Sequence, residues 1–198
     1  METTSNTATA DSVKIQADTQ GRNDVLGDFV GLVIYEFDVL KGGLLTIELT
    51  NMTDRSIGGH LTGFVFNIDS TDADARALLV KTNFAAFLDN PLEHASQFGT
   101  YDAGAALGAE LSGRGNSSGG IGVFQKGVFQ FHIEAADAAG LTALSFVSGP
   151  AAHDFVVRFQ GLSGGATDTV PIQGLPAPAA ISLFAGVGLM SSSRRRSR

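Results

Sequence analysis

The chain has 198 residues, and 43% of them are hydrophobic, which is enough for one domain with a substantial core. The absence of cysteine excludes disulfides, thiolate metal sites and thiol nucleophiles. The net charge is −7, but residues 1–174 hold nine Lys/Arg against twenty Asp/Glu and therefore carry −11. So acidic a body would repel nucleic acid, and we expect no nucleic-acid partner.

Alternating apolar residues and glycine-containing turns predict one β-rich domain over residues 25–161, after a polar N-terminal segment of residues 1–24. Residues 41–43 contain two glycines and predict a hairpin between the first two strands. About eight strand candidates are typical of an all-β fold, an antiparallel two-sheet sandwich of the jelly-roll or Greek-key kind. The strongest candidates are residues 29–40, 44–50, 61–69, 123–133, 141–147 and 155–160.

Three segments break this strand pattern. Residues 70–79 place Ser70 and Thr71 before acidic residues and then Ala and Leu, which predicts one short, capped helix. Residues 104–122 are rich in Gly and Ser and are expected to form an exposed, mobile loop. Residues 162–174 are expected to link the domain to a distinct C-terminal segment, residues 175–198.

This C-terminal segment contains no Asp or Glu and combines three parts in a fixed order. Pro176, Ala177 and Pro178 come first, an apolar run over residues 179–190 follows, and a basic cluster comes last. As a helix, the twelve-residue run would span about 18 Å, whereas a bilayer core is about 30 Å thick. We therefore expect a C-terminal apolar helix that is only a marginal membrane span, with the arginines on the cytoplasmic side. The run includes Ala179, Leu183, Phe184, Leu189 and Met190, and the cluster comprises Arg194, Arg195, Arg196 and Arg198.

The three parts resemble the PEP-CTERM sorting signal of bacteria, in which a Pro-Glu-Pro motif precedes a short apolar helix and an arginine cluster. Fifteen residues separate Pro178 from Arg194, which agrees with that signal, and Ala177 stands where the family most often has Glu. The resemblance implies export, a transient stage in the inner membrane, and cleavage near the motif by exosortase, a membrane protease. It also implies a place in the cell envelope or the extracellular matrix, associated with exopolysaccharide or biofilm.

Export normally requires a second signal at the N-terminus. Residues 1–24 lack the basic start and the long apolar run of a secretory signal. Three alternatives stay open: a start upstream of Met1, a different export route, or a relative that is not exported.

The best metal candidate is the acidic group Asp69, Asp72 and Asp74. Three carboxylates within six residues would suit Ca²⁺, which prefers oxygen ligands and tolerates irregular loops. The spacing is not that of an EF-hand, however, and acidic residues also stabilise the first turn of a helix. We favour this second role and expect no cofactor, with Ca²⁺ as the alternative.

No motif in the chain indicates catalysis. The four histidines lie far apart, and neither HExxH nor GxSxG occurs, so we expect a protein that is not an enzyme. Two alternatives stay open. One is a carbohydrate-binding module, although the only Trp or Tyr rings for stacking sugars are Tyr35 and Tyr101. The weaker one is a glycoside or other hydrolase. Its candidate acids are Glu36, Asp38, Glu48 and Glu134 on predicted strands.

Overall fold

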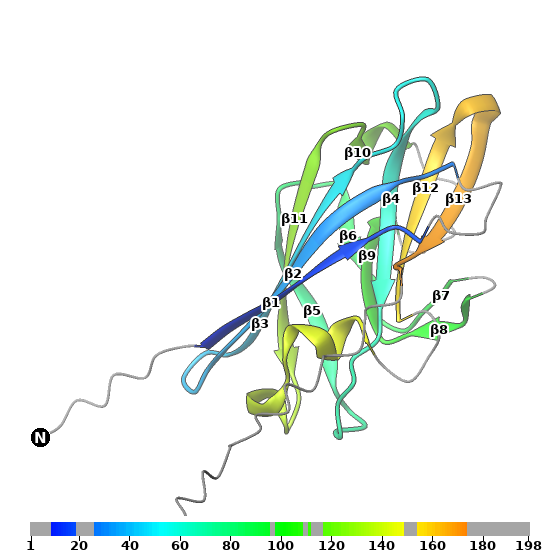
Figure 1. The fold of residues 1–198 in the computed structure, drawn as a ribbon. Coiled ribbons are helices and arrows are strands. Elements are labelled where there is room, and N and C mark those ends of the chain that lie inside the picture. Colours follow the sequence, from blue (N-terminus) through cyan, green and yellow to red (C-terminus); the bar gives the residue numbers. More distant parts are fainter. Residues whose placement is uncertain are drawn as a thin grey trace, which may run out of the picture.

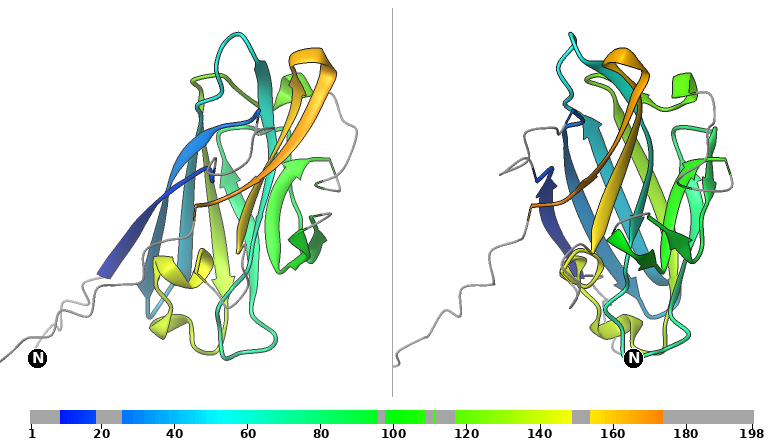
Figure 2. Two further views of the ribbon diagram at one scale, coloured as in Figure 1. Left: turned by 45° about the vertical axis from the view of Figure 1, so that its right-hand side comes forward. Right: turned by 90° about the vertical axis from the view of Figure 1, so that its right-hand side faces the viewer.

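The computed structural model describes residues 9–18, 26–95, 98–108, 111, 117–148 and 154–173. These residues form two antiparallel sheets packed face to face, joined by turns and short 3-10 segments (Figures 1 and 2). The first sheet has the order β1–β2–β3–β11–β5, and the second has the order β13–β12–β4–β9–β6, with β10 paired to one end of β4. The predicted all-β, two-sheet architecture is therefore confirmed.

The elements have the following bounds. The first sheet comprises β1 (Thr9–Gln16), β2 (Phe29–Asp38), β3 (Gly42–Asn51), β5 (Arg76–Thr82) and β11 (Lys126–Glu134). The second comprises β4 (Gly58–Phe66), β6 (Phe87–Asp89), β9 (Ala103–Leu107), β10 (Ile121–Gly122), β12 (Phe155–Leu162) and β13 (Ala166–Pro171). A small ribbon is formed by β7 (Glu93–His94) and β8 (Thr100–Tyr101). The 3-10 turns are η2 (Ser117–Gly119), η3 (Ala138–Gly140), η4 (Ala143–Phe146) and η5 (Ser163–Gly165).

Five of the six strongest strand predictions are confirmed, as β2, β3, β4, β11 and β12. The predicted hairpin is confirmed as well, since β2 pairs with β3 from Phe29 opposite Asn51 to Asp38 opposite Gly42. Gly42 has a φ of 82°, a conformation that glycine adopts without strain at the entry to the second strand.

Two edge strands lie where the sequence predicted none. β1 lies within the expected polar N-terminal segment, where only Val13, Ile15 and Ala17 alternate. β13 lies within the expected linker and has Thr167, Asp168 and Thr169 in its middle, while Val170 near its end is fully buried. An edge strand needs fewer apolar side chains and tolerates a proline such as Pro171, so composition alone conceals it.

The short helix predicted at residues 70–79 is wrong. The hydroxyls of Ser70 and Thr71 donate to Asp137 in another turn, at 2.5 and 2.8 Å, so they do not cap a helix. From Arg76 onward the chain is β5, which pairs with β11.

The strand predicted at residues 141–147 is also wrong. Ser145 and Thr142 form a capping box, which begins the 3-10 turn η4. Ala143, Phe146 and Val147 are buried, a spacing of three and four residues that belongs to a helical turn.

The exposed loop predicted at residues 104–122 begins in fact as an interior strand of the second sheet. β9 pairs with β4 on one side and with β6 on the other, and its Ala105 and Ala106 are buried. A Cβ on Gly104 would lie 2.3 Å from the carbonyl oxygen of Phe64. The small residues of β9 therefore reflect close packing.

The core between the sheets is built around phenylalanine. Phe64 of β4 is fully buried, and its ring lies 4.8 Å from that of Phe129 and 5.7 Å from that of Phe155. Phe66 and Phe131 complete the group, at 6.4 and 6.1 Å from Phe64. Since Phe129 and Phe131 belong to β11, this cluster holds the two sheets together.

The two sheets are also joined at one edge, where β1 meets β13. The backbone N–H of Asp18 donates to the carbonyl of Pro171 at 2.9 Å, and that of Gln173 donates to the carbonyl of Gln16 at 2.9 Å. Asp168 of β13 accepts the N–H of Leu26 at 2.8 Å, which fixes the approach to β2. Among the described residues, this edge is therefore closed by contacts of Asp18, Pro171 and Gln173.

The C-terminal helix, the Pro-Ala-Pro motif, the apolar run and the arginine cluster all lie outside the described residues. Within the described part of the chain, no helix has the length and apolar character needed to cross a bilayer.

Candidate functional site

The two sheets present very different outer surfaces. On the second sheet, Val65, Ala106 and Val156 point outward but are almost fully buried, because Tyr101 and Leu111 of the segment after β6 pack over them. On the first sheet, every outward side chain is half-buried or exposed. We call this outer surface of the first sheet the open face.

The open face is ordered in rows by the strand registers. Polar and apolar side chains alternate across it, and Gln130 donates to the hydroxyl of Thr46 at 3.4 Å near its centre. The rows, read across the sheet from β1, are Gln16–Val30–Thr50–Lys126, Lys14–Leu32–Glu48–Val128, Ser12–Ile34–Thr46–Gln130–Lys81 and Ala10–Glu36–Leu44–His132–Leu78.

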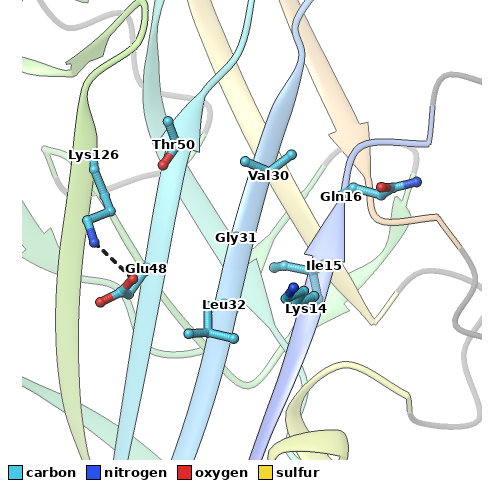
Figure 3. Close-up of a pocket in the computed structure, with 9 residues that line it drawn as sticks. All are labelled: Lys14, Ile15, Gln16, Val30, Gly31, Leu32, Glu48, Thr50 and Lys126. Carbon is cyan, nitrogen blue, oxygen red and sulfur yellow. Dashed lines mark hydrogen bonds and ion pairs between the residues drawn. The ribbon is translucent and has the colours of Figure 1, made fainter.

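A shallow groove of about 300 Å³ crosses β1, β2 and β3 on this face (Figure 3). Its floor is Gly31 between Val30 and Leu32, with Ile15 beside it. A Cβ on Gly31 would lie 2.7 Å from the carbonyl oxygen of Glu48, so the position requires glycine.

Polar side chains surround this floor. Lys14 and Gln16 stand on the β1 side, and on the other side the Lys126 ammonium lies 3.0 Å from the Glu48 carboxylate (Figure 3). Thr50 also lines the groove. The groove can therefore offer hydrogen bonds and positive charge around a small apolar floor.

Two further cavities open on the same face. One of about 190 Å³ lies between β5 and β11 and is lined by Lys81, Asn83 and Gln130, among others. The other, of about 280 Å³, lies at the β2–β3 turn and is lined by Lys41 and His132, among others. Lys14, Lys41, Lys81 and Lys126 are the four lysines of the sequence, and each of them lines one of the three cavities.

The calcium candidates Asp69, Asp72 and Asp74 do not converge on one point. Asp72 accepts the N–H of Asp74 at 3.0 Å and that of Ala136 at 2.7 Å, so both its oxygens are bound to backbone. Among the described residues, no group of three or more His, Asp or Glu side chains is placed to hold a metal ion.

Asp137 lies in the turn after β11, next to Ala136, and bonds back to the β4–β5 connection. Its carboxylate accepts hydrogen bonds from the Ser70 hydroxyl and from the N–H and hydroxyl of Thr71, at 2.5 to 2.8 Å. These bonds, that of Ser70 above all, lower the pKa of Asp137 to about 2. The acidic segment thus fastens the β4–β5 connection to the turn after β11.

The depressed pKa of Asp137 gives a prediction for acid stability. Because the folded pKa of about 2 lies below the unfolded value of about 3.9, this carboxylate stabilises the fold fully above about pH 4, and the effect is lost as the pH falls toward 2. Asp137→Asn should therefore unfold at lower denaturant than wild type at pH 6, with a difference that disappears near pH 2. Asp74→Asn removes one charge from the same region and is the control. A difference that stayed constant down to pH 2 would contradict this role.

The hydrolase candidates are spread over the open face. Glu48 pairs with Lys126, and Glu134 pairs with Arg76 at 2.6 Å. Asp38 accepts the N–H of Leu40 at 2.8 Å in the β2–β3 turn. Glu36 lines the cavity beside His132, which is half-buried on the open face.

Neither tyrosine offers a ring to a sugar. Tyr35 and Tyr101 are 2% and 1% exposed. The Tyr35 hydroxyl donates to the carbonyl of Ala138 at 2.7 Å, and burial, assisted by Asp137, raises the pKa of Tyr35 to about 12. A ligand on the open face would therefore contact aliphatic side chains such as Val30 and Leu32.

The sequence did not predict that the four lysines line cavities on one face. It does indicate on which side of its own strand Lys14 or Lys126 lies. Lys14 alternates with Val13 and Ile15, and Lys126 is followed by the alternation of β11. Alternation assigns each of them to the polar face of its own strand. It does not show that β1, β5 and β11 belong to one sheet, which is a matter of topology.

Comparison with protein-family models, with curated proteins and with solved structures finds no match to this chain.

Proposed function

We propose that this chain is an exported bacterial protein of the cell surface or extracellular matrix, sorted and processed through residues 175–198. We propose that its body is a β-sandwich of jelly-roll or Greek-key topology. We also propose that this body is not an enzyme. Exosortase is the proposed processing partner, and the apolar run of residues 179–190 is the proposed contact with the inner membrane. The association with exopolysaccharide or biofilm follows from the resemblance of the C-terminal segment.

One observation supports the proposal above all: the described strands of both sheets and the core between them are built from residues up to Gln173, all of which precede the PEP-CTERM-like segment. The N–H of Ile172 donates to the carbonyl of Phe155 at 3.1 Å, and Gln173 bonds to Gln16. Val170 and Ile172 fill the end of the core, with exposures of 0% and 6%. Cleavage near Pro176–Pro178 would therefore leave all of these described hydrogen bonds and core residues within the released body.

A reporter fusion tests the sorting role. Residues 174–198 are joined to a secreted reporter that has its own export signal, and the fusion is expressed in hosts with and without exosortase. We expect a shortened reporter only in the exosortase host, seen as a mass change. Replacing all four terminal arginines by Gln should abolish processing. A reporter that is neither cut nor held in the membrane would refute the proposal. A chain truncated after Gln173 should melt at the same temperature as the full chain.

Carbohydrate binding is the second candidate function. The observation that favours it is the open face, where hydroxyl, amide and ammonium groups surround half-buried aliphatic side chains over three shallow cavities. Sugar rings present the same mixture of hydroxyls and apolar C–H surface. Binding of the full chain to a glycan array tests this function. If the chain bound no polysaccharide on the array, carbohydrate binding would be refuted.

A further inference from the structure

We propose that the open face binds an extended acidic polysaccharide, whose carboxylate or sulfate groups are held by Lys14, Lys81 and Lys126, with Lys41 at the end of the sheet. This inference rests on the second proposed function, carbohydrate binding. The inference goes beyond that function by naming the class of ligand and the residues that recognise this ligand.

The distribution of charge supports an anionic ligand. The open face and its β2–β3 turn carry five basic residues, the four lysines and Arg76, and four acidic ones, Glu36, Asp38, Glu48 and Glu134. The rest of residues 1–174 holds four basic and sixteen acidic residues. The formal charge is therefore +1 on this face and −12 on the rest of residues 1–174, so an approaching polyanion is repelled least at this face.

Three of the lysines are available to a ligand. Within the described residues, Lys126 pairs with Glu48, while Lys14, Lys41 and Lys81 form no ion pair with a carboxylate. All four lysines are exposed. An exposed ion pair such as that of Lys126 is worth little, so a ligand carboxylate can compete with Glu48 for its ammonium.

The spacing of the lysines indicates a polymer. Lys14 lies three strands and two residues from Lys126, and Lys81 lies one strand and four residues from Lys126. Strands lie about 4.8 Å apart and rise by about 3.3 Å per residue, so the Cα atoms of these lysines are separated by about 14 to 20 Å. These are separations between backbone positions, and one chain of several sugars spans all of them, so that its contacts add through multivalency.

The side chains between the lysines suit sugars. Ser12, Gln16, Thr46, Thr50 and Gln130 are uncharged and hydrogen-bonding, and they alternate with half-buried Leu32, Ile34 and Val128. Ring hydroxyls can bond to the first group while C–H surfaces pack on the second.

A nucleic acid fits this face poorly. Duplex DNA carries a negative charge every ~1.7 Å of its axis, so the four acidic residues among the lysines would repel it. A polysaccharide with one charge on every sugar, or on every second sugar, has charges that are farther apart than those of DNA. These charges can therefore lie between the acidic residues of the face. The observations therefore favour the acidic polysaccharide.

The test compares full-length variants in binding to alginate, a polyuronate, with dextran as the neutral polymer. The first variant combines Lys14→Gln, Lys81→Gln and Lys126→Gln. Its matched control removes three charges from the C-terminal cluster, by Arg194→Gln, Arg195→Gln and Arg196→Gln. We expect at least about tenfold weaker alginate binding by the lysine variant at low salt, a smaller salt dependence than that of wild type, and less than about twofold change in the control. An unchanged melting temperature verifies that the lysine variant is folded.

Three outcomes would overturn the inference. Alginate binding that is unchanged in the lysine variant, or lost in the arginine control, would place the polyanion site elsewhere. Duplex DNA bound as tightly as alginate would make the face a general polyanion surface. If wild type and the lysine variant both bound dextran as well as alginate, the acidic ligand would be refuted, but carbohydrate binding would be supported. The sorting proposal is tested separately by the reporter fusion, so its failure is distinguishable from all of these.

Discussion

Phe64→Ala should destabilise the fold by about 3–5 kcal/mol, because it removes a fully buried ring at the centre of the core. The ring packs edge-on against Phe129 of the first sheet and stacks on Phe155 of the second, with centroids at 4.8 and 5.7 Å. Its loss leaves a cavity between the sheets that neighbouring side chains fill only in part. Since small domains are stable by about 5–15 kcal/mol, we expect a melting temperature lower by about 10 °C or more, measured by circular dichroism.

Phe124→Ala is the matched control for this substitution. Phe124 is 51% exposed, and its described ring contact is the guanidinium of Arg55, at 5.3 Å from the ring centroid. A cation–π contact at an exposed site is worth about 0.5–1 kcal/mol, so this variant should lose no more than that. Equal losses at the two positions would show that Phe64 does not hold the sheets together.

Much of the first sheet and the start of the second could be predicted, because their strands alternate clearly. In β3, for example, Leu45, Ile47 and Leu49 are fully buried while Thr46 and Glu48 face outward. The same rule fails for β13, where edge pairing with β12 replaces apolar content. The helix-capping pattern fails for residues 70–79, because Asp137, which accepts the hydroxyl hydrogen bonds of Ser70 and Thr71, lies more than sixty residues away.

The open face could be predicted only in part. The sequence assigns each lysine to a polar side of its own segment, but β1 and β11 become parts of one surface through β2 and β3. That second step depends on the strand order. Composition also conceals the charge asymmetry, since a net charge of −11 does not show where on the body the acidic residues lie.

Gly104→Ala should cost about 3 kcal/mol, although it adds a single methyl group. The new Cβ would lie 2.3 Å from the carbonyl oxygen of Phe64 and 3.0 Å from the Cα of Val65. Both atoms are backbone of β4, the strand paired with β9, so the clash is relieved only by moving the two strands apart. We expect a clearly lower melting temperature and faster amide hydrogen exchange in β4 and β9.

Gly140→Ala is the matched control, since a Cβ there would meet no atom within 4 Å and its φ is not positive. This variant should be neutral or slightly more stable, because alanine restricts the unfolded chain. The pair separates two interpretations of the same composition. If Gly104→Ala melted at the temperature of Gly140→Ala, residues 104–107 would belong to the exposed loop that a Gly-rich sequence predicts. A large difference requires β9 to pack directly against β4.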